Sequence, residues 1–137
     1  SIQPLFTENT VVKADDKKLQ KWQRIALEAC KQCGQNWLPK VKPILQFNDW
    51  VASREKSQLE IVAALDPRSA AIKVVLERQN EVSSATLLVG PEGNLSQSEY
   101  DAAIGSGYHP VSLGEIVLRV ETANLYCLSV LNYEYAK

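Results

Sequence analysis

Two glycine-containing loops, each between an apolar run and a helical segment, hold the residues best suited to chemistry. The first loop, GPEG at residues 90–93, follows the apolar run LLV at 87–89. The second begins at Gly114, after residues 110–113, and continues through Arg119 into an apolar helix. Glycine permits positive φ and close backbone approach, and amides that precede a helix can receive an electron-rich ligand. The two loops together predict one small-molecule cleft.

Signals for strands and helices alternate along the chain around these loops. Apolar runs predict strands at residues 2–6, 41–46, 59–65, 85–89 and 111–113. Helical spacing of apolar residues predicts a helix of about 17 residues that Gly34 ends; these residues are Leu19, Trp22, Ala26, Ala29 and Cys33. Asn48 is expected to cap a short helix through Trp50 and Val51. Further helices are predicted at 70–77, at 96–104 with Ser96 as cap and Glu99 at the capping-box position, and at 121–135.

This alternation predicts the fold class α/β, with a mostly parallel sheet that helices cover on both faces. In such sheets ligands bind at the carboxyl ends of the strands, and both glycine loops lie at such ends. The patterns GxGxxG and GxxxxGK do not occur in the sequence, which disfavours a nucleotide-triphosphate P-loop.

Length and composition favour one compact domain. With 137 residues and 45% hydrophobic residues, the chain can bury roughly two-thirds of its unfolded surface. It contains no apolar run near the roughly 20 residues that span a bilayer, and no signal-peptide pattern at its start. We therefore expect a soluble protein of the cytoplasm, with no membrane partner.

Positive charge is concentrated near the start of the chain, although the net charge is −1. Residues 13–42 contain eight basic residues against Asp15, Asp16 and Glu28; the basic ones are Lys13, Lys17, Lys18, Lys21, Arg24, Lys31, Lys40 and Lys42. Such a run either faces phosphates or forms a solvated helix face, and the sequence leaves both interpretations open.

The cysteines and the histidine favour structural roles. Cys30 and Cys33 have CxxC spacing but fall late in a predicted helix, whereas redox pairs sit at a helix start and zinc sites need a second ligand pair. They are interpreted, with Cys127, as small core residues, and no metal site is expected. His109, the only histidine, precedes Pro110 without a local partner base.

The two loops resemble a known family. The segments LLVGPEGNLSQSE (87–99) and VSLGEIVLRVETANLYCLS (111–129), in this order and spacing, are similar to the carboxy-terminal domain of the 16S rRNA (uracil-N3)-methyltransferases. These enzymes belong to the SPOUT superfamily of knotted, S-adenosylmethionine-dependent proteins. The likeness extends through PLFTENTVVK (4–13), KLQKWQRIALEACKQCGQN (18–36) and LPKVKP (38–43), and so covers nearly the whole chain. It implies a carboxy-terminal trefoil knot.

The resemblance also implies a cofactor site. S-adenosylmethionine would lie in a bent conformation between the two loops, with Leu65 and Asp66 bordering it. The residues that the family pattern assigns to cofactor binding are Leu65, Asp66, Leu88, Gly90, Pro91, Glu92, Gly93, Leu113, Gly114, Val117, Leu118 and Thr122. Methyl transfer from a sulfonium is a direct displacement, so no metal is required.

Arg119 and Glu121 are the candidate catalytic residues. Uracil N3 must lose a proton before it attacks, and a fixed positive charge would stabilise the resulting anion. Arg119 matches the arginine of the family's LRTETA motif, and Glu121 could accept the proton or orient Arg119. The alternatives are a surface pair of Arg119 with Glu121, and a carboxylate at the amino end of a helix favoured by the helix dipole.

Several residues depart from the family pattern. Asn94 stands where the family has the last glycine of GPEGG, and asparagine tolerates left-handed backbone. Glu115 and Ile116 replace a proline and an arginine, and Val120 replaces a threonine. Gln35 stands where relatives carry an arginine, which removes a phosphate contact.

Residues 1–137 are accordingly expected to form a SPOUT methyltransferase domain. Relative to the family it would lack a first strand and helix and an amino-terminal RNA-binding domain. The expected function is methylation of N3 of a uridine in 16S ribosomal RNA, on the RNA itself or on the assembled small subunit. The alternatives are a non-catalytic SPOUT dimer that binds cofactor or RNA without turnover, and a generic nucleotide-binding α/β module.

A homodimer is expected from the final helix, since its apolar and aromatic residues occupy more than one face and a sheet can cover only one. These residues are Leu125, Tyr126, Leu128, Ser129, Leu131, Asn132 and Tyr135.

Overall fold

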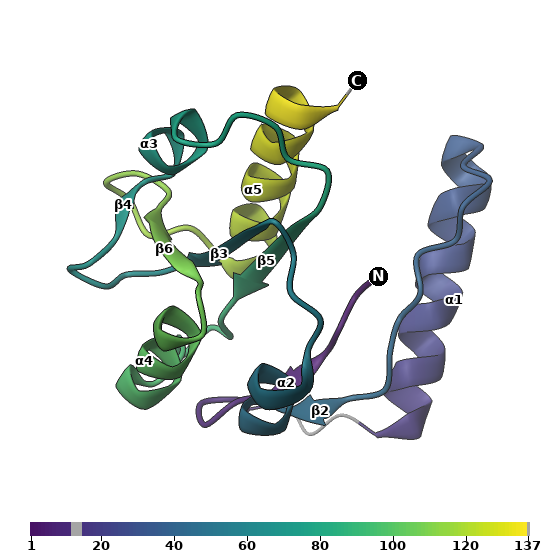
Figure 1. Cartoon of the computed structure of the whole chain (residues 1–137). Coiled ribbons are helices and arrows are strands. Elements are labelled where there is room, and N and C mark those ends of the chain that lie inside the picture. Colours follow the sequence, from purple (N-terminus) through teal and green to yellow (C-terminus); the bar gives the residue numbers. More distant parts are fainter. Residues whose placement is uncertain (12–14, 137) are drawn as a thin grey trace.

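A four-stranded parallel sheet forms the centre of the computed structural model, which describes residues 1–11 and 15–136. Its strands are β3 (Leu59–Ala63), β4 (Ala70–Ala71), β5 (Ala85–Val89) and β6 (His109–Ser112), in the order β4-β6-β3-β5. Each neighbouring pair is parallel, so the carboxyl ends of the strands lie at one edge (Figure 1). The strand at residues 85–89 has the predicted bounds.

Helices cover both faces of this sheet, and β3 separates two hydrophobic clusters. Val62 packs with Phe47 and Trp50 of α2 (Phe47–Ser53) and with α4 (Gln97–Gly105). Ile61 points to the other face, where α3 (Ile72–Glu77) and α5 (Val120–Tyr135) pack. Successive side chains of a strand point to opposite faces, and β3, which is apolar except for Glu60, is buried on both. The predicted α/β class, with a parallel sheet and helices on both faces, is confirmed.

The amino-terminal part forms a second, smaller layer. Strands β1 (Leu5–Phe6) and β2 (Leu45–Gln46) pair in parallel, and Ile2 forms an isolated bridge with Val41. The pairing is shorter than the predicted strands 2–6 and 41–46 because Pro4 and Pro43 have no N–H to donate to a ladder. Helix α1 (Asp16–Cys33) stands beside this pair, at the right of Figure 1.

Local capping signals are confirmed at two helices. Gly34 ends α1 with a left-handed φ of 69°, which glycine adopts without steric cost. Ser96 caps α4 by accepting from the backbone N–H of Glu99, whose carboxylate accepts from the N–H of Ser96 in return. This capping box stabilises the helix that follows the first glycine loop.

Two local predictions are wrong. Asn48 is not the cap of α2: the helix begins at Phe47, whose side chain is anchored in the core, and Gln46 precedes it without a side-chain cap. Residues 70–71 are not helical either. They pair with β6 as the short strand β4, because backbone pairing with a neighbouring strand overrides the high helix propensity of the two alanines.

Of the three cysteines predicted to be core residues, only Cys127 is buried. Cys127 is fully buried between α5 and the sheet, and burial raises the pKa of its thiol to about 11. Cys33 is exposed and Cys30 is half-buried, so the prediction that these two are core residues is wrong. They lie on a helix that has no buried residue.

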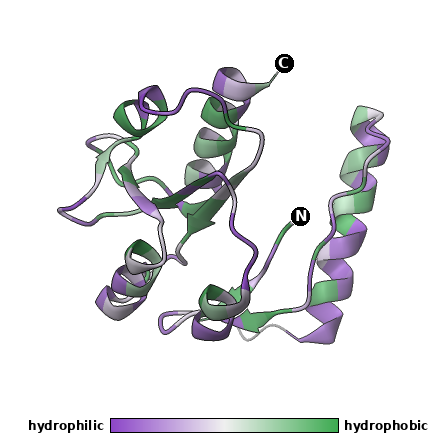
Figure 2. Cartoon of the chain, viewed as in Figure 1, coloured by the Kyte–Doolittle hydropathy of each residue, from purple (hydrophilic) through white to green (hydrophobic). Residues whose placement is uncertain are grey.

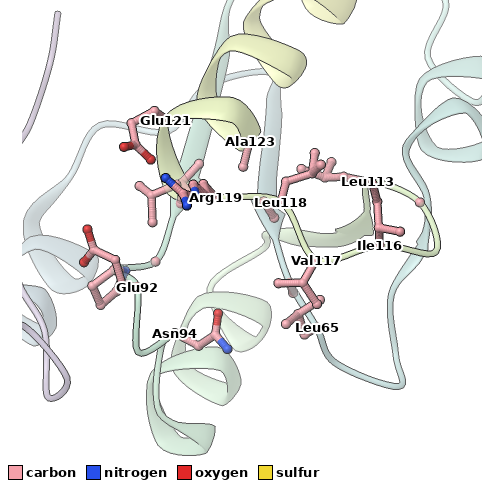
Figure 3. Close-up of a pocket in the computed structure, with 17 residues that line it drawn as sticks. Leu65, Glu92, Asn94, Leu113, Ile116, Val117, Leu118, Arg119, Glu121 and Ala123 are labelled. Carbon is pink, nitrogen blue, oxygen red and sulfur yellow. The ribbon is translucent and has the colours of Figure 1, made fainter.

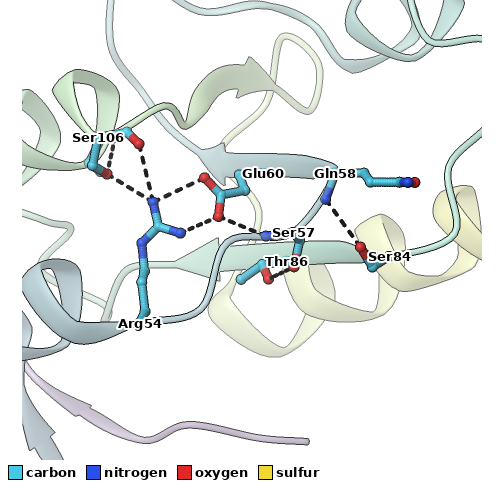
Figure 4. Close-up of polar contacts among 8 residues, drawn as sticks. Arg54, Ser57, Gln58, Glu60, Ser84, Thr86 and Ser106 are labelled. Atoms are coloured by element: carbon cyan, nitrogen blue, oxygen red, sulfur yellow. Dashed lines mark hydrogen bonds and ion pairs between the residues drawn. The ribbon is translucent and has the colours of Figure 1, made fainter.

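A buried ion pair links the start of β3 to helices α2 and α4 (Figure 4). The guanidinium of Arg54 donates to both carboxylate oxygens of Glu60 and to the backbone oxygen and hydroxyl of Ser106. It also lies 4.6 Å from the ring centroid of Tyr108. Burial is the main reason that the pKa of Tyr108 is raised to about 12. The pair lies at the end of β3 opposite to the glycine loops.

Lys13, one of the basic residues of the charged segment, lies outside the described residues. Among the helices that the structure does describe, none combines the length and the apolar character needed to cross a membrane.

Candidate functional site

A cavity of about 450 Å³ opens at the carboxyl ends of β3, β5 and β6 (Figure 3). Its walls come from the residues that end β3, from the loop that follows β5, and from the segment between β6 and α5. The lining consists of Ala63, Ala64, Leu65, Val89, Gly90, Pro91, Glu92, Asn94, Leu113, Gly114, Ile116, Val117, Leu118, Arg119, Val120, Glu121 and Ala123. The two glycine loops, far apart in the sequence, therefore border one cavity.

The first loop turns tightly between β5 and α4. A Cβ at Gly90 would lie 2.9 Å from the backbone nitrogen of Leu95, so only glycine fits there. Asn94 donates its backbone N–H to the oxygen of Pro91 at 2.8 Å and has a φ of 61°. The prediction that asparagine sustains left-handed backbone at this position is confirmed.

Gly93 serves the loop in a different way from the one predicted. It does not line the cavity, and its φ is not positive. Among the described glycines, those with positive φ are Gly34, Gly107 and Gly114. A Cβ at Gly93 would lie 3.1 Å from the Cβ of Asn9. The Asn9 amide donates to the backbone oxygens of Gly93 and Asn94 at 3.0 and 3.1 Å. A side chain at position 93 would therefore displace Asn9, and would not enter the cavity.

The segment at residues 7–10 clamps the first loop from outside. Besides the Asn9 bonds, the backbone N–H of Glu8 donates to Glu99 at 2.9 Å, and Glu99 is the buried capping residue of α4. Thr7 and Thr10 bond to each other across the turn. No local sequence pattern indicates this clamp, because it joins residues more than eighty positions apart.

The start of the second loop is shaped by Gly114 and by the hydroxyl of Ser112. Gly114 has a φ of 128°, a conformation that residues with a Cβ rarely adopt, and its N–H donates to the hydroxyl of Ser112 at 3.4 Å. Ile116 and Val117 follow with 74% and 72% of their surfaces exposed. Together with Leu65, which is 59% exposed, they present apolar surface that the chain itself does not cover.

Charged and apolar side chains separate to opposite ends of the cavity. In Figure 3, Glu92, Arg119 and Glu121 lie at the left, whereas the labelled apolar residues of the second loop and Leu65 lie at the right. The cavity is thus suited to a ligand with one apolar and one charged end.

Arg119 is placed at the start of α5, where it is the residue before the first helical turn. Its side chain is exposed and, within the described part of the chain, makes no hydrogen bond or ion pair. Glu121 lies in the first turn, where a carboxylate is favoured by the helix dipole, and forms no pair with Arg119. The guanidinium therefore remains available to a ligand in the cavity.

Asp66 directs its carboxylate away from the cavity. Its oxygens accept from the Nε and Nη2 of Arg68 at 2.8 and 2.7 Å and from the Arg68 backbone N–H at 2.8 Å. The hydrogen bond from the Arg68 side chain is the main reason that the pKa of Asp66 lies far below its usual value. Arg68 also pairs with Asp101 of α4 at 2.8 Å, and this ties the loop after β3 to that helix.

Most of the predicted cofactor residues line the cavity. The exceptions are Asp66, the buried core residue Leu88, Gly93 and the exposed Thr122. Six apolar lining residues were not among the predicted site residues: Ala63, Ala64, Val89 and Ala123, and also Ile116 and Val120, which were noted only as departures from the family pattern. The first four could have been predicted from their positions, because they lie at the ends of the predicted strands 59–65 and 85–89 and near the start of the final helix, where ligands of parallel sheets bind.

The fold and the cavity define an α/β domain with a small-molecule-sized cavity beside the carboxyl ends of a parallel sheet, and comparison with known proteins agrees with this class. A family model described as "RNA methyltransferase domain" matches residues 1–132. The chain belongs to this family.

Individual relatives are similar over nearly the whole chain. The ribosomal RNA small subunit methyltransferase E of Synechocystis is 38% identical, over 96% of this chain and 44% of the relative. That of Bacillus subtilis is 30% identical, over 96% of this chain and 54% of the relative. The chain spans about half the length of the curated relatives that it matches.

Two solved structures share the fold. A methyltransferase of Legionella pneumophila in complex with the bound cofactor SAM superimposes with a TM-score of 0.86 and 34% identity, over 96% of this chain and 54% of the other. The ribosomal RNA small subunit methyltransferase E of Neisseria gonorrhoeae, bound to S-adenosyl methionine, gives a TM-score of 0.83 and 29% identity, over 96% and 55%. The family resemblance read from the two loops is confirmed.

Proposed function

We propose that this chain binds S-adenosylmethionine in the cavity and acts in an RNA methyltransferase that modifies N3 of a uridine in 16S ribosomal RNA. The observation that carries the proposal is the cavity between the two glycine loops, with apolar residues at one end and Arg119 at the other. Two structures of the same fold contain this cofactor, and the named relatives are ribosomal RNA methyltransferases.

The residues present fit the cofactor. A volume of about 450 Å³ lies within the usual range of roughly 300–1,000 Å³ for small-molecule sites. Leu113, Val117 and Leu65 offer apolar surface to an adenosyl group, and the backbone of the first loop offers hydrogen-bonding groups beside it. When bound, the cofactor supplies an electrophilic methyl group on a sulfonium. No metal is needed for its transfer.

Arg119 is assigned to the substrate side of the reaction. Deprotonation of uracil N3 leaves negative charge on the ring oxygens, and a guanidinium fixed at the cavity stabilises that charge as it develops. Because Arg119 has no partner among the described residues, no existing bond must break for this contact to form. Glu121, two residues later at the same end of the cavity, accepts the proton or orients Arg119.

We also propose that the chain is a homodimer with a trefoil knot. Leu125, Leu128 and Tyr133 of α5 are 67%, 55% and 88% exposed, while Cys127 on the other side of the helix is fully buried. In support of the knot, β6 pairs with both β3 and β4, which are joined by a short connection, so the chain that leaves β6 must pass that connection. Sedimentation at micromolar concentration tests the dimer, and a monomer would contradict it.

A second candidate function is a non-catalytic protein that binds the cofactor or RNA without turnover. The observation that favours it is Ile116, an exposed apolar residue at the cavity where the family pattern has an arginine. Loss of that cation weakens substrate contact and leaves the backbone of the loops unchanged.

Calorimetric titration with S-adenosylmethionine, S-adenosylhomocysteine and nucleotides tests the proposal. We expect both adenosyl ligands to bind and nucleotides to bind much more weakly; binding of nucleotides alone would contradict the proposal. A methyl-transfer assay with the full-length protein and small ribosomal subunits then separates the two candidates. Methylated N3 supports the enzyme, and cofactor binding without any transfer supports the non-catalytic protein.

A further inference from the structure

Helix α1 carries an ordered stripe of positive charge. Lys17, Lys21, Arg24 and Lys31 recur at intervals of four, three and seven residues. At 3.6 residues per turn these side chains fall within an arc about 80° wide and extend over about 20 Å of the helix axis. We call these four residues the basic stripe. Glu28 lies in the same arc and pairs with Lys31 at 3.0 Å, so the stripe has one carboxylate against four cations.

The basic stripe faces solvent. All four of its residues are exposed, and within the described part of the chain neither Lys21 nor Arg24 has an ion-pair partner. The opposite side of α1 carries Trp22 and Ala26, which line an apolar groove against the amino-terminal segment. Figure 2 shows the same division along the helix, with hydrophilic and hydrophobic residues on different sides. The apolar side of α1 thus turns toward the rest of the chain and leaves the stripe outward.

An exposed tryptophan follows the stripe. The side chain of Trp37 is 84% exposed, and none of the aromatic or cation contacts among the described residues involves it. Its backbone is held against α1, because its oxygen accepts from the Sγ of Cys30 at 3.7 Å. Lys40 comes three residues later and is also exposed. The indole of Trp37 therefore follows the last turn of α1, with Lys31 six residues before it and Lys40 three residues after it.

Cations in a row together with an exposed aromatic ring are the features by which proteins bind single-stranded nucleic acid. The cations contact successive phosphates, and an unstacked base lies on the aromatic face. A duplex offers phosphates but keeps its bases stacked, so it would leave the indole without a partner. Residues 13–42 hold 8 of the 15 basic and 3 of the 16 acidic residues, so the rest of the chain has 7 basic against 13 acidic ones and phosphate binding is favoured on this segment.

We propose that α1 and Trp37 form a binding surface for single-stranded RNA, with phosphates on the basic stripe and one base stacked on the indole. This inference rests on the proposed function in so far as RNA is the substrate class. The surface is separate from the cavity, since none of its residues lines it. It would bind RNA that flanks the target uridine.

Fluorescence anisotropy of a labelled single-stranded RNA of about 12 nucleotides, titrated with the full chain at several salt concentrations, tests the surface. The stripe variant is Lys21→Ala/Arg24→Ala. Its matched control is Lys73→Ala/Arg78→Ala, which removes the same two charges from α3 and its end, on the other side of the molecule (Figure 1). Loss of two phosphate contacts should reduce the steepness of log K against log salt by about 1.4, at about 0.7 per phosphate. The control should keep the original slope.

Trp37 is tested separately by Trp37→Ala, with Trp37→Phe as the conservative variant. Loss of base stacking should weaken RNA binding by about tenfold without a change in salt slope, and phenylalanine should restore most of the affinity. Equal slopes for the stripe variant and its control would overturn the proposal. Unchanged RNA affinity of Trp37→Ala would also overturn it, as would tighter binding of duplex than of single-stranded RNA. A variant whose sedimentation changes while its RNA affinity does not would indicate that the surface binds a protein partner, and this too would overturn the proposal.

Titration with S-adenosylmethionine is carried out on the same variants. The stripe variant, its control and the two Trp37 variants should all bind it as the unchanged chain does. If the unchanged chain fails to bind the cofactor, the proposed function fails, whereas normal cofactor binding with unaltered RNA slopes refutes this surface alone.

Discussion

The buried ion pair of Arg54 and Glu60 allows a prediction whose size follows from the structure. Their side chains are 5% and 6% exposed, so neither charge can be solvated if the other is removed. Substitution Arg54→Met leaves the Glu60 carboxylate buried with the Ser57 backbone N–H, at 3.1 Å, as its remaining hydrogen-bond donor among the described residues. Removal of one partner of such a pair costs about 3–5 kcal/mol in the free energy of unfolding.

The corresponding change in melting temperature can be calculated from chain length. An unfolding entropy of about 2.1 cal/mol/K per residue gives about 0.3 kcal/mol/K for 137 residues. The variant should therefore melt about 10–17 °C below the unchanged protein. The double variant Arg54→Met/Glu60→Leu has no buried charge and should recover most of this loss. It should still lack the contacts of Arg54 with Ser106 and Tyr108.

Differential scanning calorimetry measures these differences, and the exposed pair of Lys73 and Glu77 provides a matched control. Those side chains are 83% and 61% exposed and 3.7 Å apart, so Lys73→Met should change stability by less than about 1 kcal/mol. Cofactor affinity of the folded Arg54 variant should be unchanged, because the cavity lies at the other end of β3. A melting temperature within about 3 °C of the unchanged protein, or a double variant less stable than Arg54→Met, would refute the reasoning.

Three further predictions concern the cavity, its supporting loop and the buried thiol. Arg119→Ala should leave S-adenosylmethionine affinity within a few-fold and lower methyl transfer to ribosomal RNA about a hundredfold; single-turnover assays check this, and equal rates would remove Arg119 from the reaction. Gly93→Ala should weaken cofactor binding only through Asn9, which is 3.1 Å from the added Cβ, so Asn9→Ala alone should produce a similar loss in calorimetry, and a normal Asn9→Ala would show that the clamp is unimportant. Cys127 has a pKa of about 11 and no exposed surface, so Cys33 should react with a thiol reagent in the folded protein and Cys127 only on unfolding. Because the unfolded thiol ionises near pH 8.5, this group's contribution to stability is complete below that pH and is lost as the pH rises toward about 11.

Elements governed by nearby residues were predictable from the sequence. The capping box of Ser96 and Glu99 and the left-handed Gly34 depend on contacts within a few positions, and both were found where the sequence placed them. The alternation of apolar runs with helical segments was enough for a parallel sheet covered on both faces. The position of the two loops at the carboxyl ends of strands followed from the same rule.

Features decided by distant partners were not predictable in this way. Residues 70–71 become a strand only because β6 lies beside them. A side chain at position 93 would contact Asn9. The carboxylate of Asp66 pairs with Arg68, which also pairs with Asp101, and so does not face the cavity. In each case the partner that decides the structure comes from another part of the fold, so the sequence prediction for that residue was wrong.

The departures from the family pattern affect the two loops differently. The residues of the first loop fit the conformation of its backbone. Gly90 has no Cβ, which would lie 2.9 Å from the backbone nitrogen of Leu95, and Asn94 adopts a left-handed conformation where the family has glycine. In the second loop, Gly114 keeps its positive φ, while Glu115, where the family has a proline, is exposed, and the exposed Ile116 borders the cavity. Because backbone shape forms the pocket for a cofactor and exposed side chains meet a substrate, the altered residues should change which RNA is recognised before they change cofactor affinity. If the RNA contacts both surfaces, the cations of α1 compensate for the arginine that Ile116 replaces. The substitutions Lys21→Ala/Arg24→Ala should then reduce RNA affinity more in the unchanged chain than in a chain that also carries Ile116→Arg.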